Sequence, residues 1–469
     1  MGQTIIDKLW AEHTVADLGD GATLLYIDRI FLHERTGSVA LKGLEAAGHS
    51  VRHPEQVFCT MDHIVDTTPG RTDDTRMPGG REFITSTRAS AIAAGIHLFD
   101  LGDDRQGIVH VVSPEQGIAL PGVTLVCPDS HTCTLGGLGA LAWGIGSTEA
   151  EHALATKTLA VRKPRNMRIR FEGELGPGVY AKDLILHLIS RYGASGGTGY
   201  AIEFAGAAIR ALPIEARFTL CNMAVEFGAW TGIVAPDEST FEYVRGRPFA
   251  PGPETWDKAV AHWRTLASDP DATFDREIEI DCNMLGPHIT WGTSPQHGGS
   301  IGDAVPDPAA EADNNRRQSM QRALEYMGLE PGTSLEGLPI SAAFIGSCTN
   351  SRISDLREAA RLLRGHKVAA GVKAICVPGS SQVKKAAEAE GLDRIFRDAG
   401  FEWRESGCSM CFYAGGESFG LRQRVISTTN RNFESRQGPQ TRSHLASPVT
   451  VAASALAGRI ADPRPLLGN

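Results

Sequence analysis

Short apolar runs alternate along this chain with longer segments in which apolar residues recur every three or four positions. Four runs have the length and composition of buried strands: GIVHVV (107–112), VTLVC (123–127), AAFIG (342–346) and VKAICV (372–377). Residues 351–365 and 381–400 have the spacing of amphipathic helices. The order strand, helix, strand, helix over residues 342–400 is typical of a parallel sheet and predicts an α/β fold.

Two stretches interrupt this pattern and are candidate boundaries between domains. The first is VRKPRNMR (161–168), and the second is the Gly-, Pro- and Asp-rich segment 293–315. At roughly 150 residues per domain, a chain of 469 residues should contain about three domains. We therefore expect three α/β units, at residues 1–162, 163–292 and 293–469.

Composition and charge exclude several classes of protein. With 42% hydrophobic and 22% charged residues, the chain has the composition of an ordinary folded protein. The net charge of −9 argues against a non-specific binder of nucleic acid. No apolar stretch approaches the roughly 18 to 20 residues of a spanning helix, and the N-terminus lacks the pattern of a signal peptide. These features predict a cytoplasmic location without membrane partners.

Nine cysteines, an odd number in a long chain, fit reduced thiols better than a disulfide framework. Cys348 lies between a predicted strand and a predicted helix, a place where open α/β sheets bind ligands. Cys408 and Cys411 form a C-x-x-C pair. Three such thiolates could hold an iron–sulfur cluster and leave one iron without a protein ligand. A redox pair beside a buried thiol, or a zinc site completed by a histidine, remains open from spacing alone.

The glycine-rich segment GGLGALAWGIG (136–146) superficially suggests a dinucleotide site. Its glycines lie about ten residues beyond the strand predicted to end at Cys127, whereas a Rossmann fingerprint has them in the turn directly after the strand. We expect close backbone approach at these glycines and no nicotinamide cofactor.

The sequence around the cysteines resembles the aconitase superfamily, and within it the large subunits of 3-isopropylmalate dehydratase. The matching stretches run in the same order along essentially the whole chain. They are LLYIDRIFLHE (24–34), TMDH (60–63), QGIVHVVSPEQG (106–117), CPDSHT (127–132), GGTGYAIEFAG (196–206), LCNMAVEFGA (220–229), GSCTNSR (346–352), GCSMC (407–411), STTNRNFESRQG (427–438) and SHLASP (443–448).

This resemblance implies three α/β/α domains around a [4Fe–4S] cluster, without the C-terminal swivel domain of single-chain aconitases. It implies a hydro-lyase that isomerises 2-isopropylmalate and 3-isopropylmalate by dehydration to isopropylmaleate and rehydration, as in leucine biosynthesis. The implied metal ligands are Cys348, Cys408 and Cys411. The implied catalytic residues are Asp62, His63, His110, Asp129, His131 and Glu226, and the implied substrate-binding residues are Ser130, Asn222, Asn430, Arg431 and Arg436.

Elementary chemistry is consistent with these roles. A leaving hydroxide needs a metal and a proton donor, and a hydrogen-bonded aspartate can orient a histidine. Asn222 and Glu226 are four residues apart and could share one face of a helical turn. Arg431 and Arg436 can bind a carboxylate in bidentate fashion.

The resemblance also implies a partner. Single-chain aconitases carry a further domain with a serine base, whereas this sequence ends at Asn469, soon after SHLASP. We therefore expect a separate small subunit that supplies the swivel domain and the serine, and at least a heterodimer. The expected ligand is a small dicarboxylate.

Some positions depart from the family pattern. Ile64 stands where many isopropylmalate isomerases have Asn, the loop after Cys411 reads FYAGGESFG, and WGTSPQHGG (291–299) lacks the usual Asn-Pro-Gly. Such changes can alter the size and polarity of a substrate pocket. Two alternatives follow: a paralogous dehydratase or hydratase of 2-methylmalate and citraconate, dimethylmalate or maleate, and an RNA-binding iron sensor in the apo form, which the acidic balance disfavours.

Overall fold

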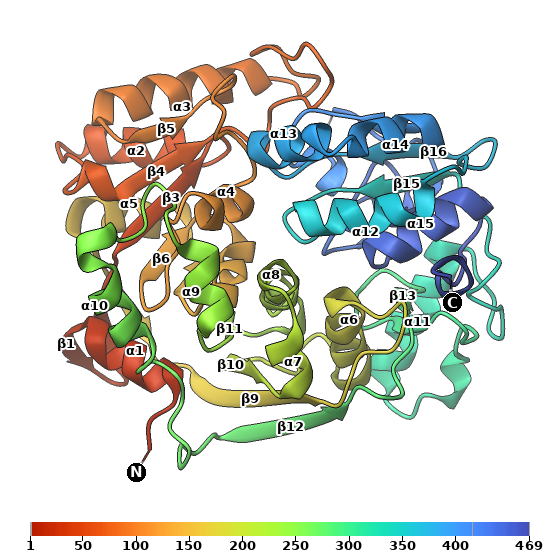
Figure 1. Cartoon of the computed structure of the whole chain (residues 1–469), viewed down its shortest axis with the longest axis horizontal. Coiled ribbons are helices and arrows are strands. Elements are labelled where there is room, and N and C mark those ends of the chain that lie inside the picture. Colours follow the sequence, from red (N-terminus) through yellow and green to blue (C-terminus); the bar gives the residue numbers. More distant parts are fainter. Residues whose placement is uncertain (1, 415, 469) are drawn as a thin grey trace.

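The computed structural model describes residues 2–414 and 416–468, and three parallel sheets dominate it (Figure 1). The first sheet has the strand order β5-β4-β3-β6-β7. The residues of the three central strands are almost entirely buried, because helices cover both faces of the sheet. The strands are β3 (Arg29–His33), β4 (Val57–Thr60), β5 (His97–Phe99), β6 (Thr124–Cys127) and β7 (Leu141–Gly144).

The helices around this sheet are α1 (Ile5–His13), α2 (Gly37–Ala46), α3 (Gly80–Ala94), α4 (Val109–Glu115) and α5 (Ser147–Thr156), with a 3-10 segment, η2 (Ser130–Leu138). A small antiparallel sheet, β1 (Thr14–Gly19), β2 (Ala22–Tyr26) and β8 (Thr158–Arg162), lies beside them. A 3-10 turn, η1 (Pro54–Gln56), precedes β4.

The second sheet has the parallel order β11-β10-β9-β12. Its strands are β9 (Arg165–Glu172), β10 (Tyr200–Ala205), β11 (Thr231–Ile233) and β12 (Arg276–Asp281). The helices that follow these strands or pack near them are α6 (Ala181–Tyr192), α7 (Ala207–Ala211), α8 (Ile214–Asn222), the 3-10 turn η3 (Val225–Phe227), α9 (Glu238–Val244) and α10 (Pro253–Trp263).

The third sheet has the parallel order β17-β16-β15-β18-β19. Its strands are β15 (Ala342–Ile345), β16 (Lys373–Cys376), β17 (Phe401–Trp403), β18 (Arg424–Ser427) and β19 (Arg442–Leu445). Its helices are α11 (Asn314–Met327), α12 (Ile353–Leu363), α13 (Ser381–Ala389), α14 (Leu392–Ala399) and α15 (Pro448–Ala457). The hairpin β13 (His288–Thr290) and β14 (Gly298–Ser300) and the 3-10 turns η4 (Pro308–Ala310), η5 (Ser409–Cys411) and η6 (Arg464–Leu466) complete the chain.

The α/β class is confirmed, and the strands predicted at 123–127, 342–346 and 372–377 are present. The strand predicted at 107–112 is wrong, because α4 begins at Val109. Every residue from Val109 to Pro114 is buried, and periodicity cannot distinguish a fully buried helix from a fully buried strand. The helical segment 381–400 divides into α13 and α14 at Gly391, which has the left-handed φ of 71°.

Core packing joins segments that are distant in the sequence. Phe241, Trp256 and Trp263, from α9 and α10, pack into the same apolar core as the first sheet. The division at 162 and 292 therefore stays a prediction. Among the residues that the structure describes, no helix has both the length and the apolar character needed to cross a membrane.

The first and third sheets face each other across the molecule (Figure 1). Ile108 N–H donates to Gly379 O at 2.8 Å, and Arg352 Nη2 donates to His110 O at 3.1 Å. These contacts bring the carboxyl ends of β3, β4 and β6 close to those of β15, β17 and β18. Ligands of open α/β folds bind at such ends, which makes this region the candidate site.

Candidate active site

A cavity of about 290 Å³ lies between the loops that follow the strands of the first and third sheets. Eleven of the fourteen residues expected from the sequence line it. They are His63, His110, Asp129, Ser130, His131, Cys348, Cys408, Cys411, Asn430, Arg431 and Arg436. Asp62, Asn222 and Glu226 lie directly behind this lining and bond to it. The structure thus brings the whole predicted set together.

The three cysteines reach the cavity from two turns of one sheet. Cys348 follows β15, and the other two cysteines follow β17, with Cys408 directly before the turn η5 and Cys411 at its end. Cys348 Sγ accepts hydrogen bonds from Asn222 Nδ2 at 3.2 Å and Asn430 Nδ2 at 3.4 Å. Burial raises the pKa of Cys348 to about 12, so without a positive partner this thiol stays protonated.

Cys408 and Cys411 influence each other's ionisation. The hydrogen bond between their side chains raises the pKa of Cys408 well above its ordinary value and lowers the pKa of Cys411. The backbone N–H of Cys408 donates to Asp62 O at 2.8 Å, which fixes this turn against the first sheet.

The spacing of the three sulfurs bears on what they could hold. Tetrahedral zinc with bonds of about 2.3 Å keeps its sulfur ligands roughly 3.8 Å apart. Among the described residues, the three thiols do not form a group in which all donor atoms lie within 4.8 Å of one another. This spacing suits a cluster of several metal ions better than a single ion. Three soft thiolate donors, two of them in a C-x-x-C turn, are also the donor set of iron–sulfur clusters.

Asp129 is the centre of a histidine–carboxylate network. Its Oδ1 bonds His110 Nε2 at 3.0 Å, and its Oδ2 bonds His63 Nε2 at 3.1 Å. It also accepts from the backbone N–H of His131 at 2.7 Å as the N-cap of η2. Burial alone would raise the pKa of Asp129, but the bonds from His110, His131 and His63 hold it well below its usual range.

His63 lies between two carboxylates, since its Nδ1 bonds Asp62 Oδ1 at 2.5 Å. Burial lowers the pKa of His63, but Asp62 and Asp129 together raise it well above its ordinary value. The two carboxylates therefore favour the protonated form of His63, which lies beside the thiols.

Glu226 joins a second histidine to an arginine. Its Oε1 bonds His131 Nε2 at 3.0 Å and accepts from Arg431 Nε at 2.7 Å, while Arg431 Nη2 donates to Ser130 Oγ at 3.0 Å. Asn222 and Glu226 do not share one α-helix: α8 ends at Asn222, and Glu226 lies in the following 3-10 turn, η3. This break in the helix directs Asn222 to the cysteine and Glu226 to the histidine.

Arg436 is a mostly buried cation at the cavity. Its Nε has no hydrogen-bond partner, and its guanidinium lies 5.8 Å from the centroid of the Phe412 ring. Burial lowers the pKa of Arg436, although not enough to discharge a guanidinium. A buried donor without a partner, next to Arg431, is suited to bind a carboxylate.

The sequence interpretation missed four residues near the cavity. His33 stacks on His63, with ring centroids 4.1 Å apart, and burial lowers its pKa to about 4. Glu34 accepts from the backbone N–H groups of Asp62 and Ile64, and Arg35 also lines the cavity. The signal for these three was their position at or directly after the end of the strand β3.

Lys182 had no sequence signal, because it comes from a helix of the second sheet. Its Nζ donates to Thr428 O at 2.9 Å and Thr429 O at 2.6 Å, immediately before Asn430. Burial lowers its pKa to about 7. The glycines after Ser130 behave as expected: a Cβ on Gly136 would lie 1.9 Å from Gly232 O, so only glycine fits there.

The profile of the aconitase family (aconitate hydratase) matches residues 7–458. The 3-isopropylmalate dehydratase large subunit 1 of Bradyrhizobium diazoefficiens is 54% identical over 463 residues, which cover 99% of this chain and 97% of that protein. The crystal structure of aconitase X from Thermococcus kodakaraensis, in its holo form, aligns with a TM-score of 0.46 and 13% identity over 91% of this chain and 89% of that one. From the profile match and the close relative, this chain belongs to the aconitase family.

Proposed function

We propose that this chain is the large subunit of a [4Fe–4S] hydro-lyase that interconverts 2-isopropylmalate and 3-isopropylmalate through isopropylmaleate. The observation that carries the proposal is the cavity in which three buried thiols meet a histidine–carboxylate network and two arginines. The relative that shares 54% identity is named as the large subunit of 3-isopropylmalate dehydratase.

Enzymes of the aconitase family carry a [4Fe–4S] cluster. In this chain Cys348, Cys408 and Cys411 would hold it, and the amides of Asn222 and Asn430 would donate to the Cys348 thiolate. When bound, the cluster supplies a Lewis-acidic iron that polarises a substrate hydroxyl.

The histidine network supplies the proton that a departing hydroxide needs. His63 holds a proton between Asp62 and Asp129, and His110 and His131 bond to the same Asp129 or to Glu226. A proton given up by one histidine can be replaced through the shared carboxylate. The network therefore acts as the general acid in dehydration and as the general base in rehydration.

Arg431 and Arg436 would bind the carboxylates of the substrate. Arg431 is held by Glu226 and Ser130, and this fixes its guanidinium for bidentate recognition. We further propose a small subunit as partner, because the relative is named as a large subunit. That partner would supply the serine base for the proton at carbon, so this chain alone would not turn over substrate.

The experiment is anaerobic turnover. The chain is produced together with a small subunit, reconstituted with iron and sulfide, and assayed by the ultraviolet absorbance of the alkene. Turnover of both isopropylmalates above 2-methylmalate, citraconate and maleate supports the proposal. Protein that stays free of iron after reconstitution, or an iron-loaded complex that makes no alkene, would refute it.

A second candidate is a hydro-lyase of another malate-type diacid. Ile64 and Phe412 lie next to His63, where a change of side chain alters the space beside the reacting atoms. Turnover of 2-methylmalate or citraconate alone in the same assay would select this candidate.

A further inference from the structure

A third arginine lies at the pocket of the three cysteines. Arg35 stands between β3 and α2, at the carboxyl end of a strand, and lines the pocket together with Arg431 and Arg436. Its side chain is exposed, whereas those of His33 and Glu34, just before it, are buried. The first sheet therefore places a guanidinium at the mouth of the pocket.

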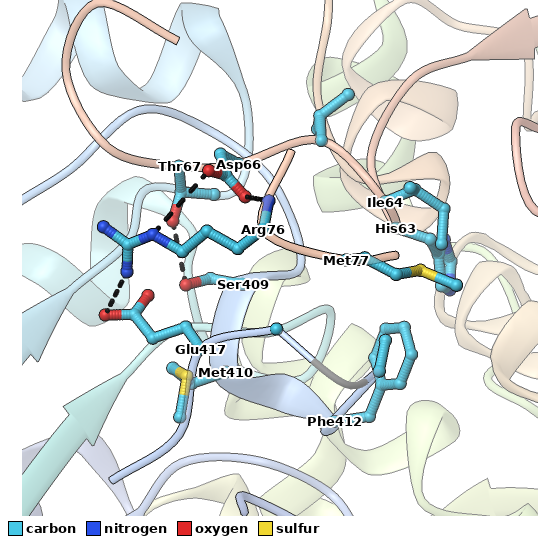
Figure 2. Close-up of a pocket in the computed structure, with 13 residues that line it drawn as sticks. His63, Ile64, Asp66, Thr67, Arg76, Met77, Ser409, Met410, Phe412 and Glu417 are labelled. Carbon is cyan, nitrogen blue, oxygen red and sulfur yellow. Dashed lines mark hydrogen bonds and ion pairs between the residues drawn. The ribbon is translucent and has the colours of Figure 1, made fainter. Parts of the chain in front are cut away.

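The ring of Phe412 lies against this guanidinium. Arg35 Cζ is 5.1 Å from the centroid of the ring, within the range of a cation–π contact. The same ring has its centroid 5.8 Å from that of His63, and Figure 2 shows the two rings near each other. Because the aromatic ring limits the positions of a flexible side chain, Arg35 loses less entropy when it binds a ligand.

Arg436 approaches the same ring from the third sheet. It lies in the loop that follows β18, and its Cζ is 5.8 Å from the centroid of the Phe412 ring. Two positive groups from different sheets thus border one side chain, and they repel each other. An anion that contacts both would remove this repulsion.

Other arginines near the pocket already have a carboxylate. Arg431 Nε pairs with Glu226 Oε1 at 2.7 Å, and Arg76 Nη1 pairs with Glu417 Oε1 at 3.2 Å (Figure 2). Arg35 forms no ion pair and no side-chain hydrogen bond with any residue that the structure describes. Its donors are therefore available to a ligand.

The pocket itself offers no carboxylate to compensate these charges. Within the described residues, Asp129 is the only carboxylate in the lining, and its oxygens already bond two histidine rings and a backbone N–H. Arg436 likewise forms no ion pair with a described residue. Two guanidiniums, those of Arg35 and Arg436, thus remain uncompensated at opposite sides of the pocket.

The start of α2 adds to the positive charge near Arg35. Thr36, which precedes this ten-residue helix, also lines the pocket, and the first turn of α2 contains no acidic residue. Backbone N–H groups at a helix N-terminus carry partial positive charge and favour anions. This corner of the pocket is therefore suited to a carboxylate.

We propose that Arg35 is a substrate-binding residue, which binds one carboxylate of the diacid while Arg436, next to Arg431, binds the other. This inference rests on the proposed function and adds to it a residue that recognises the charge of the substrate and not its alkyl group. A diacid bound in this way contacts the loops of the first and third sheets together.

The first test is kinetic and uses the reconstituted complex with the small subunit. For Arg35→Gln, which removes the charge, KM for 2-isopropylmalate should rise at least tenfold while kcat stays within threefold of the wild type. For Arg35→Lys the rise should be smaller, because an ammonium keeps the charge but cannot form two parallel hydrogen bonds. Arg52→Gln is the matched control, since Arg52 is also exposed but does not line the pocket, and its KM should not change.

Binding gives a readout independent of turnover. 2-Isopropylsuccinate and 2-methylsuccinate keep both carboxylates but lack the hydroxyl, so calorimetry with the iron-loaded complex measures their binding without dehydration. Arg35→Gln should weaken both compounds at least tenfold and by the same factor, because the lost contact is to a carboxylate. Added salt should reduce the difference between this variant and the wild type, since an exposed charge is screened.

The outcomes separate this assignment from the proposed function. Equal KM and equal succinate affinity in Arg35→Gln and Arg52→Gln overturn the assignment while wild-type turnover stands. Weaker association with the small subunit in Arg35→Gln, at unchanged succinate affinity, overturns it in favour of a contact with the partner. A wild-type complex that dehydrates no malate refutes the proposed function, and the succinate affinities then still decide whether Arg35 binds a carboxylate.

Discussion

Asn222 and Cys348 lie 126 residues apart in the sequence, and the amide of Asn222 donates to the sulfur of Cys348 at 3.2 Å. The other end of the same amide accepts from Thr349 Oγ1 at 2.9 Å, and Asn222 is fully buried. These two bonds fix the orientation of the amide toward the sulfur. A buried N–H aimed at a sulfur favours the thiolate, which is the form that binds metal.

Replacing Asn222 should therefore weaken metal binding without unfolding the chain. We expect Asn222→Ala to release iron to a chelator 10 to 100 times faster than the wild type, because the Cys348 thiolate loses a donor. The measurement is the decay of visible absorbance under anaerobic conditions. Asn315→Ala, at an exposed position of α11, is the control, and equal decay rates for Asn222→Ala and the control would contradict the prediction.

The thiols themselves should be required for iron. Cys348→Ala and Cys411→Ala should each retain far less iron and acid-labile sulfide after reconstitution than the wild type. Cys282→Ala is the matched control, since Cys282 is also a buried free cysteine but lies after β12, away from the pocket. Iron content like that of the control in either variant would exclude that cysteine as a ligand.

Glu226 bonds both His131 and Arg431, and its replacement should affect the catalytic rate more than the binding of metal. Glu226→Gln keeps the shape but removes the charge, and we expect kcat to fall about 10²-fold or more with iron content unchanged. Burial lowers the pKa of His131, while Glu226 and Asp129 raise it above its ordinary value. Without the charge of Glu226 the pKa of His131 should fall, so the part of the pH–rate profile that depends on His131 should move to lower pH. A wild-type pH profile in this variant would show that Glu226 does not tune the histidine.

Glu115 should make stability depend on pH, away from the active site. Its Oε1 accepts from Ser380 Oγ at 2.9 Å, its Oε2 is buried without a hydrogen-bond partner, and burial raises its pKa from 4.5 to about 7. Because the native state holds this proton to a higher pH than the unfolded chain, its contribution to stability falls as the pH rises from 4.5 to 7.

Glu115→Gln removes that titration. The Tm of the variant relative to the wild type should rise across this pH window and level off above pH 7. The corresponding gain in the free energy of unfolding is about 3 kcal/mol at most. Thermal melts of both proteins in matched buffers check it. Parallel curves from pH 5 to pH 8 would mean that Glu115 titrates as it does in the unfolded chain.

The sequence predicted the α/β class and the strand that precedes Cys348, because uniformly apolar runs bounded by polar turns have few other structures available. It could not show that GIVHVV is helical, since a fully buried helix has the same pattern. The resemblance supplied the fourteen site residues, and they lie together, while their roles remain predictions. The position of Lys182 beside the pocket arises only from packing between segments distant in the sequence, which no local pattern encodes.

The pocket lies between the loops of the first and third sheets, and this has a mechanical consequence. A molecule bound there touches turns of both sheets at once, from His63 and Asp129 on one side to Cys348 and Arg436 on the other. Its binding free energy therefore adds to the free energy needed to separate the first sheet from the third. Emptying the site should weaken the association of the two sheets, so that proteases would cut the loops of an empty molecule before any strand has unfolded.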